Sequence, residues 1–217
     1  MIDGIETTVD REAVVVTARE PLAALSSAFV RGGFASARAI VNLHVPKNLH
    51  QEDTDTLLPT FVDRQRIPGP WVGLLTAAWT ERAEVAEERL NGVTALAIVT
   101  VGLSNRVAAG LTPIGVWAPS TINAIVVVDA APDPAALVNA VMSVTEVKTS
   151  LLAAADLRCA DGHAASGTST DAIVVAATGH GARQRFGGPI SDLGWVVARA
   201  ARAALGVGIQ RWIEEHR

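Results

Sequence analysis

Short runs of β-branched and other apolar residues recur along the chain, and small polar or turn-forming residues bound each run. Such runs are typical of strands. Apolar residues at helical spacing occupy other segments. The pattern predicts strands near residues 12–18, 36–45, 71–77, 93–101, 121–129 and 171–178, and helices near residues 51–65, 80–90, 133–155 and 190–215.

The order of these elements, in which neighbouring strands are followed by helices, predicts a mixed parallel and antiparallel sheet covered by helices. The chain has 217 residues and contains no internal repeat or Gly/Ser/Pro-rich linker. We therefore expect a single domain over residues 1–217, of the α/β class with a mixed α+β order. A chain of this length buries about 70% of its unfolded surface, so its core needs no disulfide.

The helix predicted at 133–155 contains one unusual position. Asp133 is suited to the N-cap and Pro134 to the first helical position, where a missing N–H costs nothing. At about 100° per residue, Leu137 and Val141 lie on one apolar arc, and Lys148 falls between their directions. The polar stripe opposite this arc contains Asn139, Ser143, Glu146 and Ser150.

Lys148 has two interpretations. Its long apolar stem can follow the sheet while the ammonium reaches water, with no function. Alternatively, the ammonium is buried and paired with a carboxylate, where it would orient that group or stabilise an oxyanion. We favour the second interpretation because of the central position of Lys148 on the arc. Asp171 is then the expected partner, because Glu146 points to another side of the helix.

Polar residues follow or precede several predicted strands. The segment 93–101 is followed by Ser104 and Asn105, and the segment 121–129 begins with Thr121 and Asn123. If these two strands pair antiparallel, the end of the first lies beside the start of the second. The four side chains then lie at one edge of the sheet.

The connection between the strands 121–129 and 171–178 extends this polar edge. A strand–helix–strand connection makes the strands 121–129 and 171–178 parallel. Their starts then share an edge, which brings Thr168, Thr170 and Asp171 to the group. The helix between them runs back toward the same edge, so its second half approaches too, with Thr145, Glu146 and Lys148.

The strand 36–45 carries Asn42 and His44 on one face and is followed by Lys47. Its orientation is open at this stage. If it runs parallel to 93–101, its polar end joins the same group. His44 is more often a core residue than a catalytic base at such a position.

Thr168 and its neighbours also permit two interpretations. Gly, Ser and Thr favour turns, so Gly167-Thr168-Ser169-Thr170 reads as an ordinary turn. The same segment could supply a nucleophilic hydroxyl, but no histidine flanks it, and the turn is favoured.

Composition and charge narrow the functional class. The net charge is −4, so the chain lacks a basic footprint for nucleic acid. No apolar run approaches the roughly 18 residues that span a membrane. One cysteine, Cys159, fits a reducing compartment, and we expect a cytoplasmic protein. No dinucleotide or phosphate-loop motif is present, so no organic cofactor is expected. The sequence leaves a metal requirement and a homo-oligomer open.

Several motifs together resemble the adenosylcobinamide amidohydrolase family. The resemblance covers about residues 25–205, and the joint order and spacing of the motifs carry it. The motifs are Val41-Asn42-Leu43-His44-Val45-Pro46-Lys47-Asn48, Gly73-Leu74-Leu75-Thr76-Ala77-Ala78, Thr100-Val101-Gly102-Leu103-Ser104-Asn105, Thr121-Ile122-Asn123, Thr145-Glu146-Val147-Lys148-Thr149, Gly167-Thr168-Ser169-Thr170-Asp171-Ala172 and Gly188-Pro189.

The resemblance implies hydrolysis of adenosylcobinamide, an incomplete corrinoid, to aminopropanol and adenosylcobyric acid during cobamide (vitamin B12) salvage. The cobalt corrinoid is then a small-molecule substrate and not a cofactor. The catalytic residues expected are Lys148, Asp171, Glu146 and Thr168. The substrate-binding residues expected are Asn42, His44, Lys47, Thr76, Ser104, Asn105, Thr121, Asn123 and Thr170.

Two departures from the family pattern bear on the substrate. Ser120 stands where the family usually has Gly, and Phe186-Gly187-Gly188 replaces a Tyr-Ala-Gly pattern. Trp71, Trp79 and Trp117 are candidates for a corrin-facing wall, although core packing is the simpler role for each. The alternatives to the amidohydrolase are a non-catalytic corrinoid-binding protein and an amidase for another large substrate.

Overall fold

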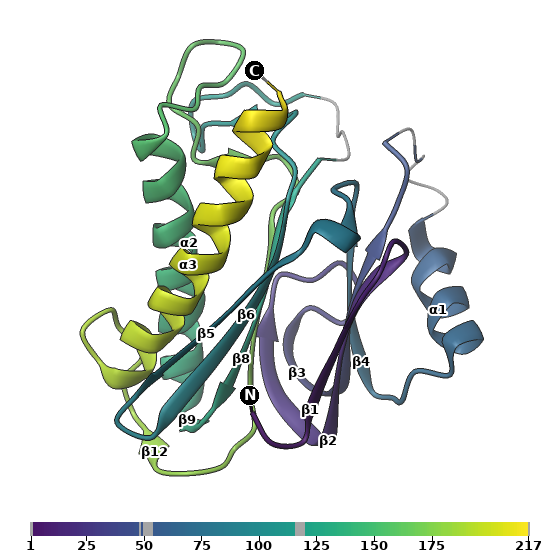
Figure 1. Cartoon of the computed structure of the whole chain (residues 1–217), viewed down its shortest axis with the longest axis vertical. Helices are drawn as coiled ribbons and strands as arrows, with labels where there is room; N and C mark the ends of the chain where they lie inside the picture. Colours follow the sequence, from purple (N-terminus) through teal and green to yellow (C-terminus); the bar gives the residue numbers. More distant parts are fainter. Residues whose placement is uncertain (1, 48, 50–53, 116–119, 217) are drawn as a thin grey trace.

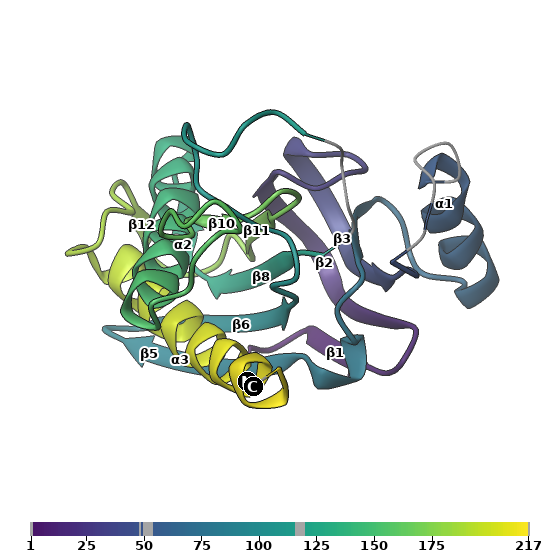
Figure 2. The ribbon, with the colours of Figure 1, turned by 90° about the horizontal axis from the view of Figure 1, so that it is seen from above.

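Two β-layers pack face to face, and helices cover both outer surfaces (Figures 1 and 2). The computed structural model describes residues 2–47, 49, 54–115 and 120–216. The main strands are β1 (Ile5–Val9), β2 (Ala13–Ser26), β3 (Gly33–His44), β4 (Trp71–Thr76), β5 (Glu84–Leu90), β6 (Val93–Val101), β8 (Ile122–Asp129) and β11 (Ala172–Ala177). The helices are α1 (Thr54–Gln65), α2 (Pro134–Ala154) and α3 (Asp192–Glu215), and short elements are η2 (Thr80–Arg82), β7 (Arg106–Val107), β9 (Ala131–Pro132), β10 (Gly167–Thr168) and β12 (Arg183–Gln184).

One continuous hydrogen-bonded path joins both layers, in the order β4-β3-β2-β11-β8-β6-β5, with β1 paired to β2. The pairs β3–β4 and β8–β11 are parallel, whereas β2–β3, β2–β11, β6–β8 and β5–β6 are antiparallel. The predicted single domain with a mixed sheet is therefore confirmed.

The long strand β2 passes from one layer to the other. Its register with β3 shifts between Thr17 and Leu22. Residues 23–26 pair with β11, whereas residues 14–18 pair with β1. A shift of this kind bends a strand and increases its twist. The bend folds the first half of β2, with β3 and β4, over the face of β6 and β8.

Three apolar cores follow from this arrangement. The central core lies between the layers and includes Val16, Ile40, Leu74, Ile98 and Ile125. On one outer face, α2 and α3 pack on β6, β8 and β11. On the other outer face, α1 packs on β2 and β3. The strands β6, β8 and β11 are apolar on both faces because both of their faces are covered.

The helix predicted at 80–90 is wrong. Residues 80–82 form one 3-10 turn, and residues 84–90 form β5, whose residues alternate between half-buried and exposed. The acidic residues that suggest a solvated helix form ion pairs with α3, since Glu84 pairs with Arg211 and Glu88 with Arg199. A local pattern does not reveal these partners, which lie more than 100 residues away.

Helix α2 begins where predicted, with Asp133 at the N-cap position and Pro134 in the first turn, but the Asp133 side chain makes no capping hydrogen bond and binds Arg183 instead. By length and composition alone it is also long and apolar enough to cross a membrane. In the structure its apolar side chains pack against the sheet and α3, which is typical of a core helix. Ser143, placed on the polar stripe, is buried instead, because α2 has two buried sides and not one.

Candidate functional site

The polar edge predicted from the strand ends exists at the top of the molecule in Figure 1. Val101, at the end of β6, pairs with Ile122 at the start of β8. Ala172, at the start of β11, pairs in parallel with Asn123 of β8. Both predicted pairings are confirmed, so the ends of these three strands meet at one edge.

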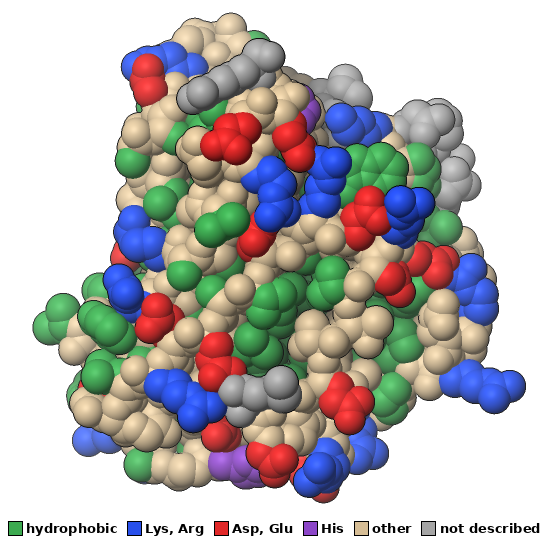
Figure 3. Space-filling view, in the orientation of Figure 1, with side chains coloured by type: hydrophobic (Ala, Val, Ile, Leu, Met, Phe, Trp, Pro, Cys, Tyr) green, Lys and Arg blue, Asp and Glu red, His purple; other side chains and the backbone are tan. Residues whose placement is uncertain are grey.

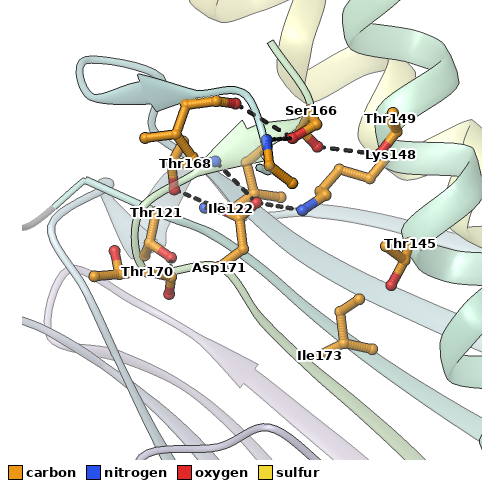
Figure 4. A network of polar contacts seen from close by, with 12 residues as sticks. Thr121, Ile122, Thr145, Lys148, Thr149, Ser166, Thr168, Thr170, Asp171 and Ile173 are labelled. Atoms are coloured by element: carbon orange, nitrogen blue, oxygen red, sulfur yellow. Dashed lines mark hydrogen bonds and ion pairs between the residues drawn. The ribbon is translucent and has the colours of Figure 1, made fainter. Parts of the chain in front are cut away.

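An ion pair between helix and strand lies at this edge. The Lys148 ammonium, from α2, contacts Oδ2 of Asp171, the residue before β11 (Figure 4). The side chains are only 10% and 9% exposed. The interpretation of Lys148 as a buried, paired ammonium is therefore the one that the structure supports.

Asp171 accepts four hydrogen bonds. Oδ1 accepts from the backbone N–H of Ile122 at 2.9 Å and from the Thr168 hydroxyl at 2.5 Å. Oδ2 accepts from Lys148 and from the backbone N–H of Thr168 at 3.0 Å. A carboxylate has about four acceptor positions, so Asp171 is saturated. It joins α2, the 167–171 turn and β8, which suits positioning better than proton abstraction.

Gly167 leaves the space that the ion pair occupies. A Cβ atom at this position would lie 2.3 Å from Asp171 Oδ2 and 2.6 Å from Lys148 Nζ. Real Cβ atoms do not approach polar atoms so closely, so any larger residue would displace the pair. Sequence reasoning missed this role of Gly167, which it interpreted as a turn residue only.

A second, neutral polar cluster lies between the layers. The Asn123 amide donates to Asn42 Oδ1 at 2.8 Å and to the Leu75 carbonyl at 2.9 Å. The Asn42 amide donates to the Thr100 hydroxyl at 3.0 Å. Asn42 and Asn123 are 2% and 1% exposed. Their direct contact with substrate stays a prediction, and their observed partners are internal.

The order of pairings makes β3 parallel to β8 and antiparallel to β6. The polar end of β3 was expected at this edge only if β3 ran parallel to β6, and that condition is not met. Asn42 reaches the cluster by another route, across the space between the stacked layers. The bend in β2 and β3 brings the end of β3 over the ends of β6 and β8.

A cavity of about 320 Å³ opens beside these clusters. We call it the threonine cavity. Its polar lining includes Thr76, Thr121, Thr170 and Asp171, and its apolar lining includes Phe29 and Leu74. The Thr121 hydroxyl contacts the Thr170 carbonyl at 2.7 Å and Asn123 Oδ1 at 3.0 Å. Further members of the lining, none of them predicted from the sequence to bind substrate or act in catalysis, are Ser27, Val45, Leu75, Ala77, Ser120, Ser169 and Ala172.

A smaller cavity of about 120 Å³ adjoins it. We call it the indole cavity, because Trp79 and Trp212 line it. Ala77 and Ser120 line both cavities, so the two are neighbours on one rim. Lys47 and Ser104, predicted to bind substrate, line the indole cavity.

The other predicted residues occupy different places. Nδ1 of His44 donates to the Ala78 carbonyl at 3.0 Å, and its ring stacks on Trp79. The Asn105 amide donates to the Ser169 hydroxyl at 2.6 Å, next to the threonine cavity. Thr168 is buried and ends the short strand β10, and the turn predicted for this segment is formed by the next two residues, Ser169 and Thr170.

The structure does not bring Glu146 to this group. Glu146 is exposed and lies with Arg199 and Arg202 in a depression between α2 and α3. Thr145 is also exposed, and its hydroxyl donates to the Val141 carbonyl of its own helix, apart from the Asp171 network in Figure 4. Consecutive residues of a helix point in different directions, so Lys148 faces the edge whereas Thr145 and Glu146 do not.

Among the candidate wall residues, Trp71 packs in the core beside α1, Trp79 lines the indole cavity, and Trp117 lies outside the described residues. In the described part of the chain, no group of three or more His, Cys, Asp or Glu side chains is placed to hold a metal ion. Acidic and basic side chains are interspersed over the face seen in Figure 3, as the mild net charge suggests.

Comparison with known structures supports the layered fold. A β-aminopeptidase of a Burkholderia species superposes with a TM-score of 0.56 at 15% identity, covering 94% of this chain and 79% of the other. The PH0078 protein of Pyrococcus horikoshii OT3 superposes with a TM-score of 0.51 at 14% identity, covering 97% and 80%. At such identities the similarity concerns the fold alone.

Sequence comparison is more specific. No curated relative matches the chain. The family model described as adenosylcobinamide amidohydrolase (CbiZ) matches residues 1–217, the whole chain. Its members are named for hydrolysis of adenosylcobinamide, the reaction that the motifs also indicate. This chain belongs to the adenosylcobinamide amidohydrolase family.

Proposed function

We propose that the family reaction takes place in the threonine cavity, where the chain would hydrolyse the amide that joins aminopropanol to the corrinoid and leave adenosylcobyric acid. One observation carries this assignment: a cavity lined by Thr76, Thr121, Thr170 and Asp171 lies at the junction of three strand ends. We also propose a cytoplasmic location, supported by the single, buried, unpaired Cys159.

The size of the cavity bears on how the substrate binds. A corrin ring with its peripheral amides is far larger than about 320 Å³. Only the aminopropanol arm is therefore expected to enter, while the ring lies across the rim. The mixed lining suits this arm, because it presents apolar walls to the methylene groups and hydroxyls to the amide.

Amide hydrolysis needs a nucleophile, donors for the oxyanion and a proton for the leaving amine. We assign the contact with the scissile amide to Thr121, whose hydroxyl is buried, lines the cavity and is oriented by Asn123 and Thr170. Thr168 differs from Thr121 in that it lines neither cavity. We therefore assign positioning roles to Thr168, Lys148 and Asp171.

The test is incubation of the purified chain with adenosylcobinamide, with chromatographic detection of adenosylcobyric acid and aminopropanol. Release of both products is expected. Tight binding without release would favour the non-catalytic corrinoid-binding alternative. Release of amine from other amides only would favour an amidase for another substrate.

Thr121 is tested by Thr121→Val, which keeps the shape of the side chain and removes the hydroxyl. We expect kcat/KM to fall at least about 100-fold, since an oxyanion or nucleophile contact has this magnitude. Thr178 is a matched control, because it lies at the opposite end of β11 and donates to Asp129 at 2.8 Å. Equal kinetics for Thr121→Val and Thr178→Val would refute the assignment.

A further inference from the structure

The indole cavity has no role in the amide chemistry described above. We propose that it binds the adenine ring of the cobalt-bound adenosyl ligand, with the Trp79 indole as the surface on which adenine stacks. This inference rests on the proposed function, because it takes the amide arm of the same substrate to occupy the threonine cavity.

Position is the first argument. Ala77 and Ser120 line both cavities, so a ligand that spans this rim contacts both. Adenosylcobinamide carries two flat conjugated units, the corrin ring and adenine. The corrin ring is too broad for a cavity of about 120 Å³, whereas a single purine is of the right scale.

The aromatic side chains are the second argument. Trp79 is 54% exposed, although a large indole is usually covered. Its ring stacks on His44 with centroids 4.7 Å apart and an interplanar angle of 19°. The His44 ring is held in turn by its hydrogen bond to the Ala78 carbonyl. An exposed indole that is fixed in orientation is a platform for a heteroaromatic ring.

The second indole of the lining is held in the same way. Trp212 stacks on His216 with centroids 4.1 Å apart, and the Arg106 guanidinium lies 5.4 Å from its ring. Two small residues, Gly102 and Gly208, form part of the lining. A Cβ atom on Gly208 would lie 2.7 Å from Val101 Cγ2, so this close packing of α3 on β6 requires glycine.

Charge is the third argument, because it favours a neutral ring over a phosphate. Three cations, Lys47, Arg82 and Arg211, line the cavity, but both arginines are neutralised, since Arg82 pairs with Glu215 at 2.5 Å and Arg211 pairs with Glu84. Ser120 Oγ accepts from the Ser104 N–H at 2.9 Å, so its own hydrogen can be donated to a ring nitrogen.

The decisive experiment compares two substrates, adenosylcobinamide and methylcobinamide, which lacks adenine. Trp79→Ala should raise KM for adenosylcobinamide about tenfold, the effect of losing one base–aromatic stack. Trp79→Phe should recover most of the affinity. KM for methylcobinamide, or its inhibition constant against adenosylcobinamide if it binds without turnover, should stay unchanged in both variants. Trp195→Ala is the control, because Trp195 is a half-exposed tryptophan that lines a different depression.

Two results would overturn the proposal. An equal rise in KM for both substrates would place Trp79 against the corrin ring, and no change for either would remove it from the site. Binding of 5′-deoxyadenosine, measured by saturation-transfer NMR, separates this proposal from the reaction. If the wild-type chain binds 5′-deoxyadenosine, Trp79→Ala abolishes this binding, and adenosylcobinamide is not hydrolysed, then the proposed function alone is wrong. If the wild-type chain does not bind 5′-deoxyadenosine, the adenine site is wrong.

Discussion

Two ion pairs tie helix α2 to the segments at either end of β11, and they differ in burial. At the start of β11, Lys148 pairs with Asp171, and the side chains are 10% and 9% exposed. Beyond its end, Asp133 pairs with Arg183 through two hydrogen bonds of 2.7 and 2.8 Å. In this second pair Arg183 is 72% exposed and Asp133 is 27% exposed.

The comparison shows how burial changes what an ion pair does. Water and salt screen the Asp133–Arg183 pair. If either partner is replaced, water can solvate the charge that remains. Neither Lys148 nor Asp171 has that alternative, and each depends on the other and on the three further donors around Asp171. The buried pair therefore fixes the geometry of the site, whereas the exposed pair connects the start of α2 to the segment that follows β11.

The largest expected effect comes from breaking the buried pair. Lys148→Met keeps the apolar stem and leaves Asp171 without its cation, whereas Asp171→Asn leaves the ammonium buried and turns an amide group toward backbone donors. Each should cost about 3–5 kcal/mol of unfolding free energy and most of the activity. Denaturant unfolding and the aminopropanol assay measure the two effects.

The double variant sharpens this expectation. Because the two residues act as one unit, the double variant should be much less destabilised than the sum of the single changes. Additive losses would show that Lys148 and Asp171 contribute independently. If the single variants are as stable as the wild type, the Lys148 ammonium is solvated and the pair does not stabilise the fold.

A smaller effect is expected from Gly167→Ala, which changes neither charge. The added Cβ would overlap Asp171 Oδ2, so we expect a loss of about 1–3 kcal/mol and reduced kcat. Gly206→Ala is the matched control, because a Cβ there meets no atom within 4 Å and lies in α3. It should stabilise the protein by about 1 kcal/mol through helix propensity. Equal behaviour of the two variants would argue against steric protection of the pair.

The smallest effect is expected at the exposed pair. Arg183→Gln should leave the melting temperature near that of the wild type, and the small difference should vanish at high salt. The hydrogen bonds from Arg183 and its positive charge lower the pKa of Asp133 below its ordinary value. Stability from this pair is thus present above the unfolded-state pKa and lost as pH falls through the lowered folded-state pKa. A large loss of stability in Arg183→Gln that does not depend on salt would show that the exposed pair contributes as much as a buried one.

Local chemistry explains which features of the fold were predictable. Pro134 marks the start of α2 because its preference for the first turn depends on local backbone geometry, whereas the Asp133 side chain binds the distant Arg183 and does not cap the helix. The parallel pairing of β8 with β11 follows from the crossover helix α2 between them, whereas the antiparallel pairing of β6 with β8 was a condition that the structure meets. The β5 segment was misassigned because its charged side chains are satisfied by arginines of α3, which are distant in sequence.

For the site, the sequence by itself determined the buried lysine and its partner. Lys148 lies on an apolar arc, where an unpaired ammonium is too costly, and chain direction brings Asp171 to the same edge. Only the tertiary structure decided that Asn42 meets Asn123, that Glu146 faces outward, and that the two cavities share a rim. The physical reason is that periodicity and connectivity act within and between neighbouring elements, whereas the folding of one β-layer over another depends on the bend in β2 and on packing summed over the whole core.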